Sequence, residues 1–157
     1  MKPHGNALET KLVFVFGTLK QGFPNFATNR GRRVGDPAQA DRYRTQQRYP
    51  LYLVGSRHSP WLLDAPGQGA QVLGELYAVS AEVLADMDRL ERVQAPDGYV
   101  RQRIMVEPVA DDGSACGPAR EAFVYLKRAE QLDPAEIRLG PLAEYQAAHA
   151  ALYRPRA

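Results

Sequence analysis

Glu91 is the residue of this 157-residue chain whose type and position point most directly to chemistry. Residues 80–93 have the spacing of an amphipathic helix, with Ser80 as the N-cap. At about 100° per residue, Glu91 lies about 20° from Leu84, inside the apolar face of that helix. A carboxylate facing a core is unfavourable unless it is paired or has a function. Partial burial would raise the pKa of this carboxyl toward the range of a general base.

Two alternatives stay open for this helix. In the first, Glu91 lies near a frayed helix end and pairs with Arg92 or a neighbouring arginine. In the second, Asp88 is the inward acid, since it lies about 40° from Leu84 on the other side. We prefer Glu91, because it lies further inside the apolar face, which is formed by Val83, Leu84, Met87 and Leu90.

The turn after the first apolar segment is the second feature with chemical potential. The alternating Val and Phe residues of Lys11–Phe16 predict a buried strand that ends at Gly17, Thr18 and Leu19. A turn that contains glycine can present backbone N–H groups to a carboxylate or phosphate. The alternative is a core strand followed by an ordinary turn. Together, this turn and an inward carboxylate are compatible with a pocket that binds a carboxylated substrate and moves one proton.

Composition restricts the class of protein. A net charge of +2, with 45% hydrophobic and 24% charged residues, is typical of a soluble globular chain. We expect a single domain over 1–157, with a loose N-terminus (1–10) and a C-terminal helical extension (129–157). One cysteine and three scattered histidines predict no internal disulfide and no metal site. No apolar run approaches about 18 residues and the N-terminus lacks a signal-peptide core, so we expect a cytoplasmic protein.

The order of the predicted elements indicates an α+β fold. About six short strands and one interrupting helix predict a small barrel-like β structure with added helices. The predicted strands cover residues 11–16, 38–44, 49–55, 72–79, 99–109 and 120–126. Gly74, inside one of these strands, suggests a bulge or a close approach by another backbone.

Arginines are concentrated between Arg30 and Arg48. They form either a solvated surface or a basic rim that attracts an anionic substrate. A nucleic-acid partner is the third possibility, but the near-neutral net charge and the lack of interleaved aromatic residues argue against it. We therefore predict no nucleic-acid and no membrane partner. The sequence carries no signal for an oligomeric state.

At this point an ordered series of motifs resembles a known family. The segment 14–20 (Phe-Val-Phe-Gly-Thr-Leu-Lys) is similar to the Tyr-Gly-(Ser/Thr)-Leu signature of the gamma-glutamylcyclotransferase-like superfamily. The similarity covers about residues 11–128, with a weaker echo at 152–155, and is closest to the gamma-glutamylamine cyclotransferases. Matching segments follow in order at 49–51, 60–63, 74–79, 90–91, 99–101 and 123–125.

The resemblance implies a small mixed β-barrel with flanking helices and an enzyme that needs no cofactor or metal. Its partner would be a small-molecule gamma-glutamyl substrate. Gly17, Thr18 and Leu19 would offer backbone N–H groups to the α-carboxylate of the gamma-glutamyl group. Glu91 would act as the catalytic base, giving 5-oxoproline and a free amine or amino acid. Phe16 would line the same pocket. Tyr125, at the end of the last predicted strand, either closes this pocket with its hydroxyl or is simply half-buried.

Phe16 departs from the family pattern, which usually has Tyr at this position. The missing hydroxyl leaves open an alternative function, a non-catalytic module of the same fold that binds a small carboxylated ligand.

Overall fold

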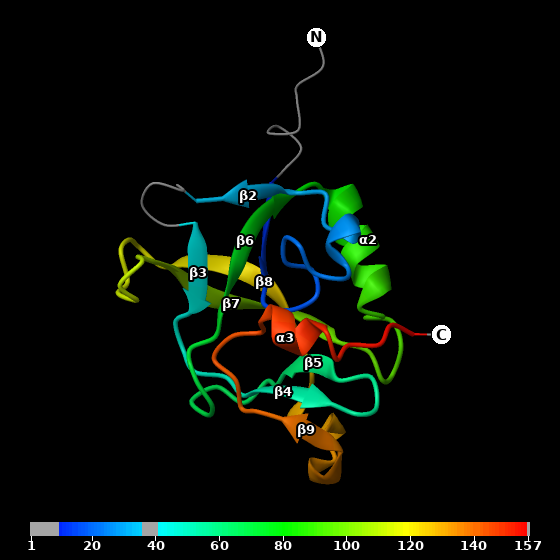
Figure 1. The fold of residues 1–157 in the computed structure, drawn as a ribbon. Coiled ribbons are helices and arrows are strands. Elements are labelled where there is room, and N and C mark those ends of the chain that lie inside the picture. Colours follow the sequence, from blue (N-terminus) through cyan, green and yellow to red (C-terminus); the bar gives the residue numbers. More distant parts are fainter. Residues whose placement is uncertain (1–9, 36–40, 157) are drawn as a thin grey trace.

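A closed five-stranded barrel forms the centre of the computed structural model, which describes residues 10–35 and 41–156 (Figure 1). Strand β1 pairs in parallel with β8 and in antiparallel with β6, which closes the barrel. The predicted α+β class and small mixed barrel with flanking helices are therefore confirmed. In barrel order the strands are β1 (Lys11–Val15), β8 (Arg120–Leu126), β7 (Val100–Val109), β3 (Arg42–Thr45) and β6 (Leu73–Val79); β2 (Arg32–Val34) pairs with β6 as a sixth strand.

A three-stranded sheet and several short helices complete the described structure. The sheet has the order β5 (Ser59–Leu62), β4 (Leu51–Val54) and β9 (Ile137–Leu139), and it lies below the barrel in Figure 1. Helix α2 (Ala81–Leu90) is capped by Ser80, whose hydroxyl accepts a hydrogen bond from the Val83 amide, as predicted. The helix ends at Leu90, before the predicted end at 93. The remaining helices are η1 (Phe26–Thr28), η2 (Ala129–Gln131), η3 (Pro134–Glu136) and α3 (Ala147–Ala150).

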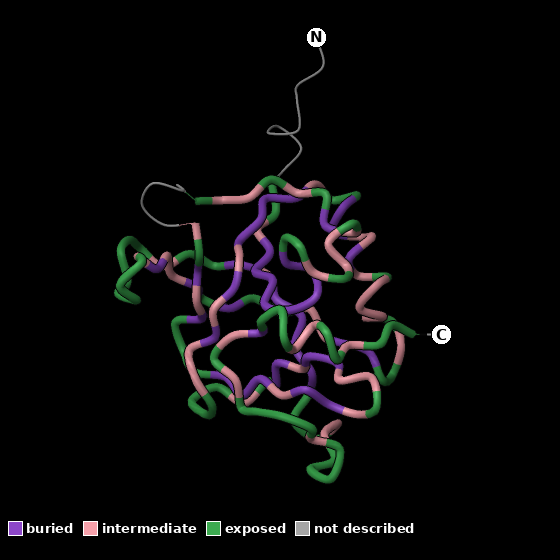
Figure 2. The backbone as a smooth tube through the Cα atoms, in the orientation of Figure 1, coloured by how far each residue is buried: buried purple, intermediate pink, exposed green. Residues whose placement is uncertain are grey.

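Strand β1 is buried on both of its faces. Phe14 and Phe16 belong to the cluster of side chains inside the barrel, whereas Val13 and Val15 pack in a second cluster with α2. Successive side chains of a strand point to opposite faces, so an uninterrupted apolar run is the sequence signature of such a strand. Figure 2 shows the same pattern, with buried backbone along the barrel strands and exposed backbone at the outer loops.

The C-terminal region, predicted as a helical extension over 129–157, contains only the short helices η2, η3 and α3 in its described part. Its only α-helix in the described part is α3, a single turn, and β9 is a strand. Pro134 and the Gly140-Pro141 pair interrupt any longer helix. The segment before α3 is irregular, and its apolar residues pack against the barrel: Tyr145 is fully buried in the barrel core. The predicted loose N-terminus lies almost entirely in 1–9, and part of the predicted strand 38–44 lies in 36–40, both outside the described residues.

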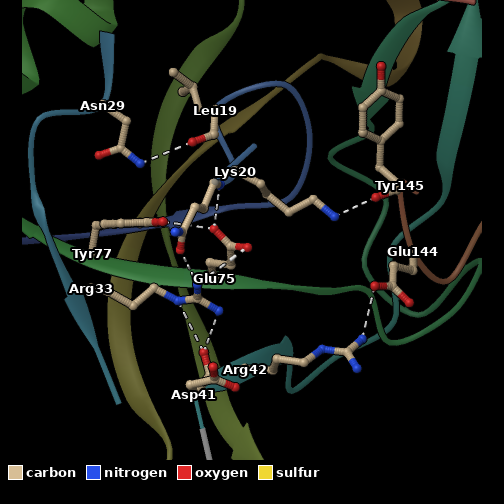
Figure 3. A network of polar contacts seen from close by, with 11 residues as sticks. Leu19, Lys20, Asn29, Arg33, Asp41, Arg42, Glu75, Tyr77, Glu144 and Tyr145 are labelled. Carbon is tan, nitrogen blue, oxygen red and sulfur yellow. Dashed lines mark hydrogen bonds and ion pairs between the residues drawn. The ribbon is translucent and has the colours of Figure 1, made fainter. Parts of the chain in front are cut away.

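A polar network ties the loop after β1 to this C-terminal segment (Figure 3). Lys20 is buried, and its Nζ donates a hydrogen bond to the backbone oxygen of Tyr145. Burial lowers the pKa of Lys20, an effect that the neighbouring carboxylates of Glu144 and Glu75 partly offset. Glu144 also pairs with Arg42 on β3 at 3.0 Å. The loop that carries the predicted anion-binding turn is thus held against a segment 125 residues away in the sequence.

Carboxylates neutralise several arginines of the basic region. Ion pairs join Arg30 to Asp86, Arg33 to Glu75, Arg42 to Glu144 and Arg44 to Glu107. These pairs agree with a structured protein surface and weaken the case for a nucleic-acid site. Within residues 10–35 and 41–156, no helix has the length and apolar character needed to cross a membrane.

Gly74 lies in close contact with β1, which generates a stability prediction. A Cβ at this position would lie 2.4 Å from the Val15 carbonyl oxygen and 2.7 Å from Cζ of Phe14. We expect Gly74→Ala to lower the free energy of unfolding by about 2–3 kcal/mol, because the strands must move apart. Urea denaturation measures the loss.

The matched control is Gly113→Ala in the β7–β8 turn. A Cβ there meets no atom within 4 Å, although φ is +87°, so the cost is limited to about 1 kcal/mol of backbone strain. An equal or smaller loss for Gly74→Ala would show that the strands are not in such close contact.

Candidate active site

One cavity of about 230 Å³ opens between the turn after β1, the C-terminal end of α2 and the C-terminal tail. It brings together all six residues that the sequence singled out: Phe16, Gly17, Thr18, Leu19, Glu91 and Tyr125. Aromatic and apolar side chains form much of its wall. The other lining residues are Phe14, Val15, Asn25, Arg57, Ser59, Pro60, Leu90, Tyr99, Tyr153, Pro155 and Arg156.

Backbone hydrogen bonds at the end of α2 fix the position of Glu91. It is the C-cap of α2, and its amide donates to the Met87 carbonyl oxygen at 2.9 Å. Its own carbonyl accepts the Tyr99 amide at 3.0 Å, which closes the loop between α2 and β7. A Cβ at Gly98 would lie 1.7 Å from the Arg92 carbonyl oxygen, so this loop needs glycine there. The loop therefore fixes the position of the carboxylate at the cavity.

The electrostatic surroundings of Glu91 suit proton transfer near neutral pH. Desolvation by burial raises the pKa of its carboxyl from 4.5 to about 7. The positive charges of Lys127, Arg156 and Arg57 act in the opposite direction and limit this rise. The side chain keeps some accessible surface, because the residue lines the cavity.

Glu91 lies at the end of α2, as the first alternative supposed, but it forms no ion pair with an arginine among the described residues. Arg92 pairs with Asp97 at 2.9 Å and not with Glu91. Asp88 pairs with Arg101 and accepts a hydrogen bond from the Tyr125 hydroxyl at 2.7 Å. Asp88 does not line the cavity, so its carboxylate serves to connect α2 to β7 and β8.

Asn25 determines the shape of the turn at Gly17, Thr18 and Leu19. Its amide donates to the Thr18 carbonyl oxygen, and its Nδ2 donates to the Thr18 hydroxyl, both at 2.8 Å. Among the described residues, none accepts a hydrogen bond from the amides of Thr18 or Leu19. These two donors are therefore available to a ligand in the cavity.

Two buried tyrosines have hydroxyls that are already engaged. The Tyr125 hydroxyl donates to Asp88, so the ring lines the cavity while the hydroxyl connects to α2. Tyr99 donates to the Pro60 carbonyl oxygen at 2.7 Å. Burial is the main cause that raises the pKa of both phenols, so both stay protonated at neutral pH. Phe16 is buried and adds an apolar wall.

The C-terminal tail is the part of the site that sequence reasoning missed. Arg57 and Arg154 exchange hydrogen bonds: the Arg57 Nε donates to the Arg154 carbonyl, and the Arg154 amide donates to the Arg57 carbonyl, both at 2.9 Å. Tyr153 accepts at its hydroxyl from Arg57 at 3.3 Å and from Asn25 at 3.4 Å. These bonds place Tyr153, Pro155 and Arg156 at the cavity. The echo of the family pattern at 152–155 was a signal for Tyr153, whereas nothing local indicated Arg57 or Arg156.

A metal centre is not evident in the described residues, where no three His, Cys, Asp or Glu side chains gather in a geometry that could hold an ion.

Known proteins share this fold and sequence pattern. The structure matches the crystal structure of an AIG2-like protein from Mus musculus with a TM-score of 0.72 and 29% identity, covering 93% of this chain and 96% of that one. A gamma-glutamylaminecyclotransferase from Homo sapiens is 36% identical over 150 residues, which is 92% of this chain and 97% of the relative. Gamma-glutamylaminecyclotransferase B from Danio rerio is 39% identical over 116 residues, which is 74% of this chain and 59% of the relative.

The family model described as gamma-glutamyl cyclotransferase, AIG2-like, matches residues 13–146. The chain belongs to this family, and the resemblance inferred from the sequence is confirmed. The matched range contains Glu91 and the turn at 17–19, but it ends before the tail residues Tyr153 and Arg156.

The raised pKa of Glu91 generates a prediction about stability. A carboxyl with a pKa of 4.5 unfolded and about 7 folded binds its proton more tightly in the folded protein. The stabilisation is complete below about pH 4.5 and is lost as the pH rises through about 7. We expect Glu91→Gln to match wild type in free energy of unfolding at pH 4.5 and to exceed it at pH 8 by on the order of 3 kcal/mol.

Urea denaturation of both proteins at the two pH values measures this difference. Glu82→Gln, which removes an exposed carboxylate from the same helix, is the matched control. A Glu91→Gln effect of the same size at both pH values would mean that the carboxyl is not desolvated in the folded protein.

Proposed function

We propose that this protein is a gamma-glutamyl cyclotransferase, which converts a gamma-glutamyl amine or amino acid into 5-oxoproline and a free amine. The observation that carries the proposal is the placement of Glu91, with a pKa raised to about 7, on the same cavity as the turn at 17–19. Family membership and the names of the relatives support the same reaction class.

Substrate binding would use the turn after β1. The amides of Thr18 and Leu19 have no acceptor among the described residues, and the α-carboxylate of the gamma-glutamyl group supplies one. Phe16 and Tyr125 would enclose the aliphatic part of the glutamyl chain between apolar surfaces. The α-ammonium group would then lie toward Glu91, which is the one acidic residue among the described residues that line the cavity.

The reaction moves two protons from the attacking to the leaving nitrogen and exchanges one amide bond for another. Glu91 accepts a proton from the α-ammonium group, which becomes a nucleophilic amine. The amine nitrogen attacks the gamma-carbonyl carbon of the same molecule, forming a tetrahedral intermediate. The bond to the leaving nitrogen then breaks as Glu91 returns the first proton to that nitrogen. Glu91 next takes the second proton from the ring nitrogen and passes it to the released amine, which leaves as an ammonium group. Atoms and charge balance with no water consumed, and the intramolecular attack gains from orientation in the enclosed cavity.

A pKa near the working pH suits both halves of this cycle. A carboxylate with an ordinary pKa of 4.5 would be a weak base toward an ammonium group at neutral pH. With a pKa of about 7, Glu91 accepts and returns the proton at similar cost. Removal of a general acid–base group costs a factor of about 10²–10⁴ in rate.

The alternative function, a non-catalytic binding module, remains testable because of Phe16. Thermal stabilisation by 5-oxoproline, without release of 5-oxoproline from any gamma-glutamyl compound, would favour that function over catalysis.

Replacement of the base is the direct test of the proposed mechanism. We expect Glu91→Gln to lower kcat for 5-oxoproline release by about 10²–10⁴-fold, because the amide cannot accept the ammonium proton. Chromatographic measurement of 5-oxoproline gives the rates. Asp88→Asn is the matched control, since Asp88 is on the same helix but does not line the cavity. Equal activity of wild type and Glu91→Gln would exclude Glu91 as the base.

The pH dependence gives an independent prediction. We expect kcat/KM to rise about tenfold per pH unit on the acid side and to level off near pH 7, as Glu91 ionises. Lys127 does not line the cavity, but its charge lowers the pKa of Glu91. Lys127→Met should therefore move the acid limb to higher pH. A limb that stays in place in this variant would assign the titration to another group.

A further inference from the structure

Tyr153 carries the one phenol at the cavity whose proton is not engaged within the described residues. Three tyrosines line the cavity, and the hydroxyls of Tyr99 and Tyr125 donate to protein oxygens. The Tyr153 oxygen instead accepts two hydrogen bonds, from the Arg57 guanidinium at 3.3 Å and from the Asn25 amide nitrogen at 3.4 Å. Neither nitrogen can accept a hydrogen bond in return. The Tyr153 proton therefore has no acceptor in residues 10–35 and 41–156 and is available to a ligand in the cavity.

Arg57 makes this hydroxyl a stronger donor. Its guanidinium donates to the phenol oxygen and also lies over the Tyr153 ring, with its central carbon 5.6 Å from the ring centroid. A hydrogen bond accepted from a cation withdraws electron density from the oxygen, which strengthens the O–H group as a donor. Such a donor stabilises an oxygen that gains negative charge more than it stabilises a neutral one. The expected acceptor is thus an oxygen on which charge develops during the reaction.

Asn25 places this donor beside the turn after β1. Its Nδ2 donates to the Thr18 hydroxyl at 2.8 Å as well as to the Tyr153 hydroxyl. A single amide nitrogen therefore separates Tyr153 from the turn that would hold the α-carboxylate. When the α-nitrogen attacks, the α-carbon and the gamma-carbonyl carbon flank it in the forming ring, so the gamma-carbonyl oxygen lies only a few ångströms from the α-carboxylate. The Tyr153 hydroxyl is on the part of the cavity that this oxygen would occupy.

We propose that Tyr153 is a catalytic residue whose hydroxyl donates a hydrogen bond to the gamma-carbonyl oxygen and stabilises the negative charge of the tetrahedral intermediate. This inference rests on the proposed function and adds a second residue to its mechanism. The proton stays on the phenol oxygen throughout, so both proton transfers remain with Glu91. Arg57 is a positioning residue, because together with Asn25 it occupies the lone pairs of the oxygen and leaves the O–H group for the substrate.

Removal of the hydroxyl is the first test. Tyr153→Phe keeps the ring and should lower kcat for release of 5-oxoproline from gamma-glutamyl-propylamine by about 10²–10³-fold, the effect of one lost oxyanion donor. KM should stay within about threefold, because the hydrogen bond strengthens only as charge develops. Tyr52→Phe is the matched control, since Tyr52 lies on β4 and does not line the cavity, and it should keep the wild-type kcat. An unchanged kcat in Tyr153→Phe would overturn the proposal.

A sulfur substitution in the substrate distinguishes catalysis from a structural role of the tail. In the thioamide of the same substrate, sulfur replaces the gamma-carbonyl oxygen and is a weaker hydrogen-bond acceptor. Tyr153→Phe should therefore slow the amide more than the thioamide and lower the amide-to-thioamide ratio of kcat by at least about tenfold. Release of propylamine from both substrates, corrected for the uncatalysed rate, is measured by chromatography. A hydroxyl that only holds Asn25 and the turn would slow both substrates equally, and that unchanged ratio would refute the proposal.

The same ratio tests the role of Arg57. Arg57→Gln should lower the amide-to-thioamide ratio several-fold when Tyr153 is present and leave it unchanged in the Tyr153→Phe background, because Arg57 acts through the phenol. The ratio cancels any change in the ionisation of Glu91, which Arg57 also affects. Arg154→Gln is the matched control, since Arg154 contacts Arg57 through its backbone and does not line the cavity. An equal effect of Arg57→Gln in both backgrounds would refute this role of Arg57.

The inference and the proposed function fail in different ways. Release of 5-oxoproline by wild-type protein, at a rate that Tyr153→Phe does not change, would exclude Tyr153 as the donor and still support cyclotransferase activity. Absence of 5-oxoproline from gamma-glutamyl-propylamine with wild-type protein would count against the proposed function and, with it, against the role of Tyr153.

Discussion

Burial of β1 on both faces is the constraint on which the rest of the structure depends. Its phenylalanines fill the barrel and its valines pack with α2, so the strand can neither slip by one residue nor move outward. The turn at 17–19 comes directly after β1, so the fixed strand also fixes the position of the turn. The turn is also held on both sides. Before it, the end of β1 is in close contact with Gly74 of β6, and after it, the buried Lys20 is hydrogen-bonded to the backbone of Tyr145. A rigid strand thus presents backbone donors at a defined place without any dedicated side chain.

Backbone closure positions the carboxylate opposite these donors. The hydrogen bond from the Tyr99 amide to the Glu91 carbonyl joins the end of α2 to the start of β7, and Gly98 permits the close approach. Glu91 is therefore the residue that ends the helix and not a residue within it. The hydrogen-bonded loop that follows fixes its position. Asp88, one turn earlier, takes the structural ion pair with Arg101. Two acids three residues apart have separate roles because only one of them is placed at the cavity.

Local patterns allowed much of this arrangement to be predicted, and long-range contacts account for what was missed. The apolar run of β1, the Ser80 cap and the inward position of Glu91 follow from periodicity within a few residues. The family resemblance added the connection between Glu91 and the turn. The tail, predicted as a helical extension, is helical only in short pieces, because the spacing of Leu142 and Tyr145 suits a helix as well as an anchored irregular segment. Arg57 reaches the tail through hydrogen bonds to residues 96 and 97 positions away in the sequence, which no local periodicity encodes.

The electrostatics of the cavity explain why so distant a tail belongs to the site. Desolvation alone would keep Glu91 protonated at neutral pH, while full hydration would make its carboxylate too weak a base for an ammonium group. The intermediate pKa of about 7 requires burial and positive charge together. That charge comes from Arg57 after β4, Lys127 after β8 and Arg156 in the tail, three segments that meet only in the folded protein. One of these charges, Arg156, belongs to the tail, so the docking of the tail contributes to the basicity of Glu91 as well as enclosing the cavity.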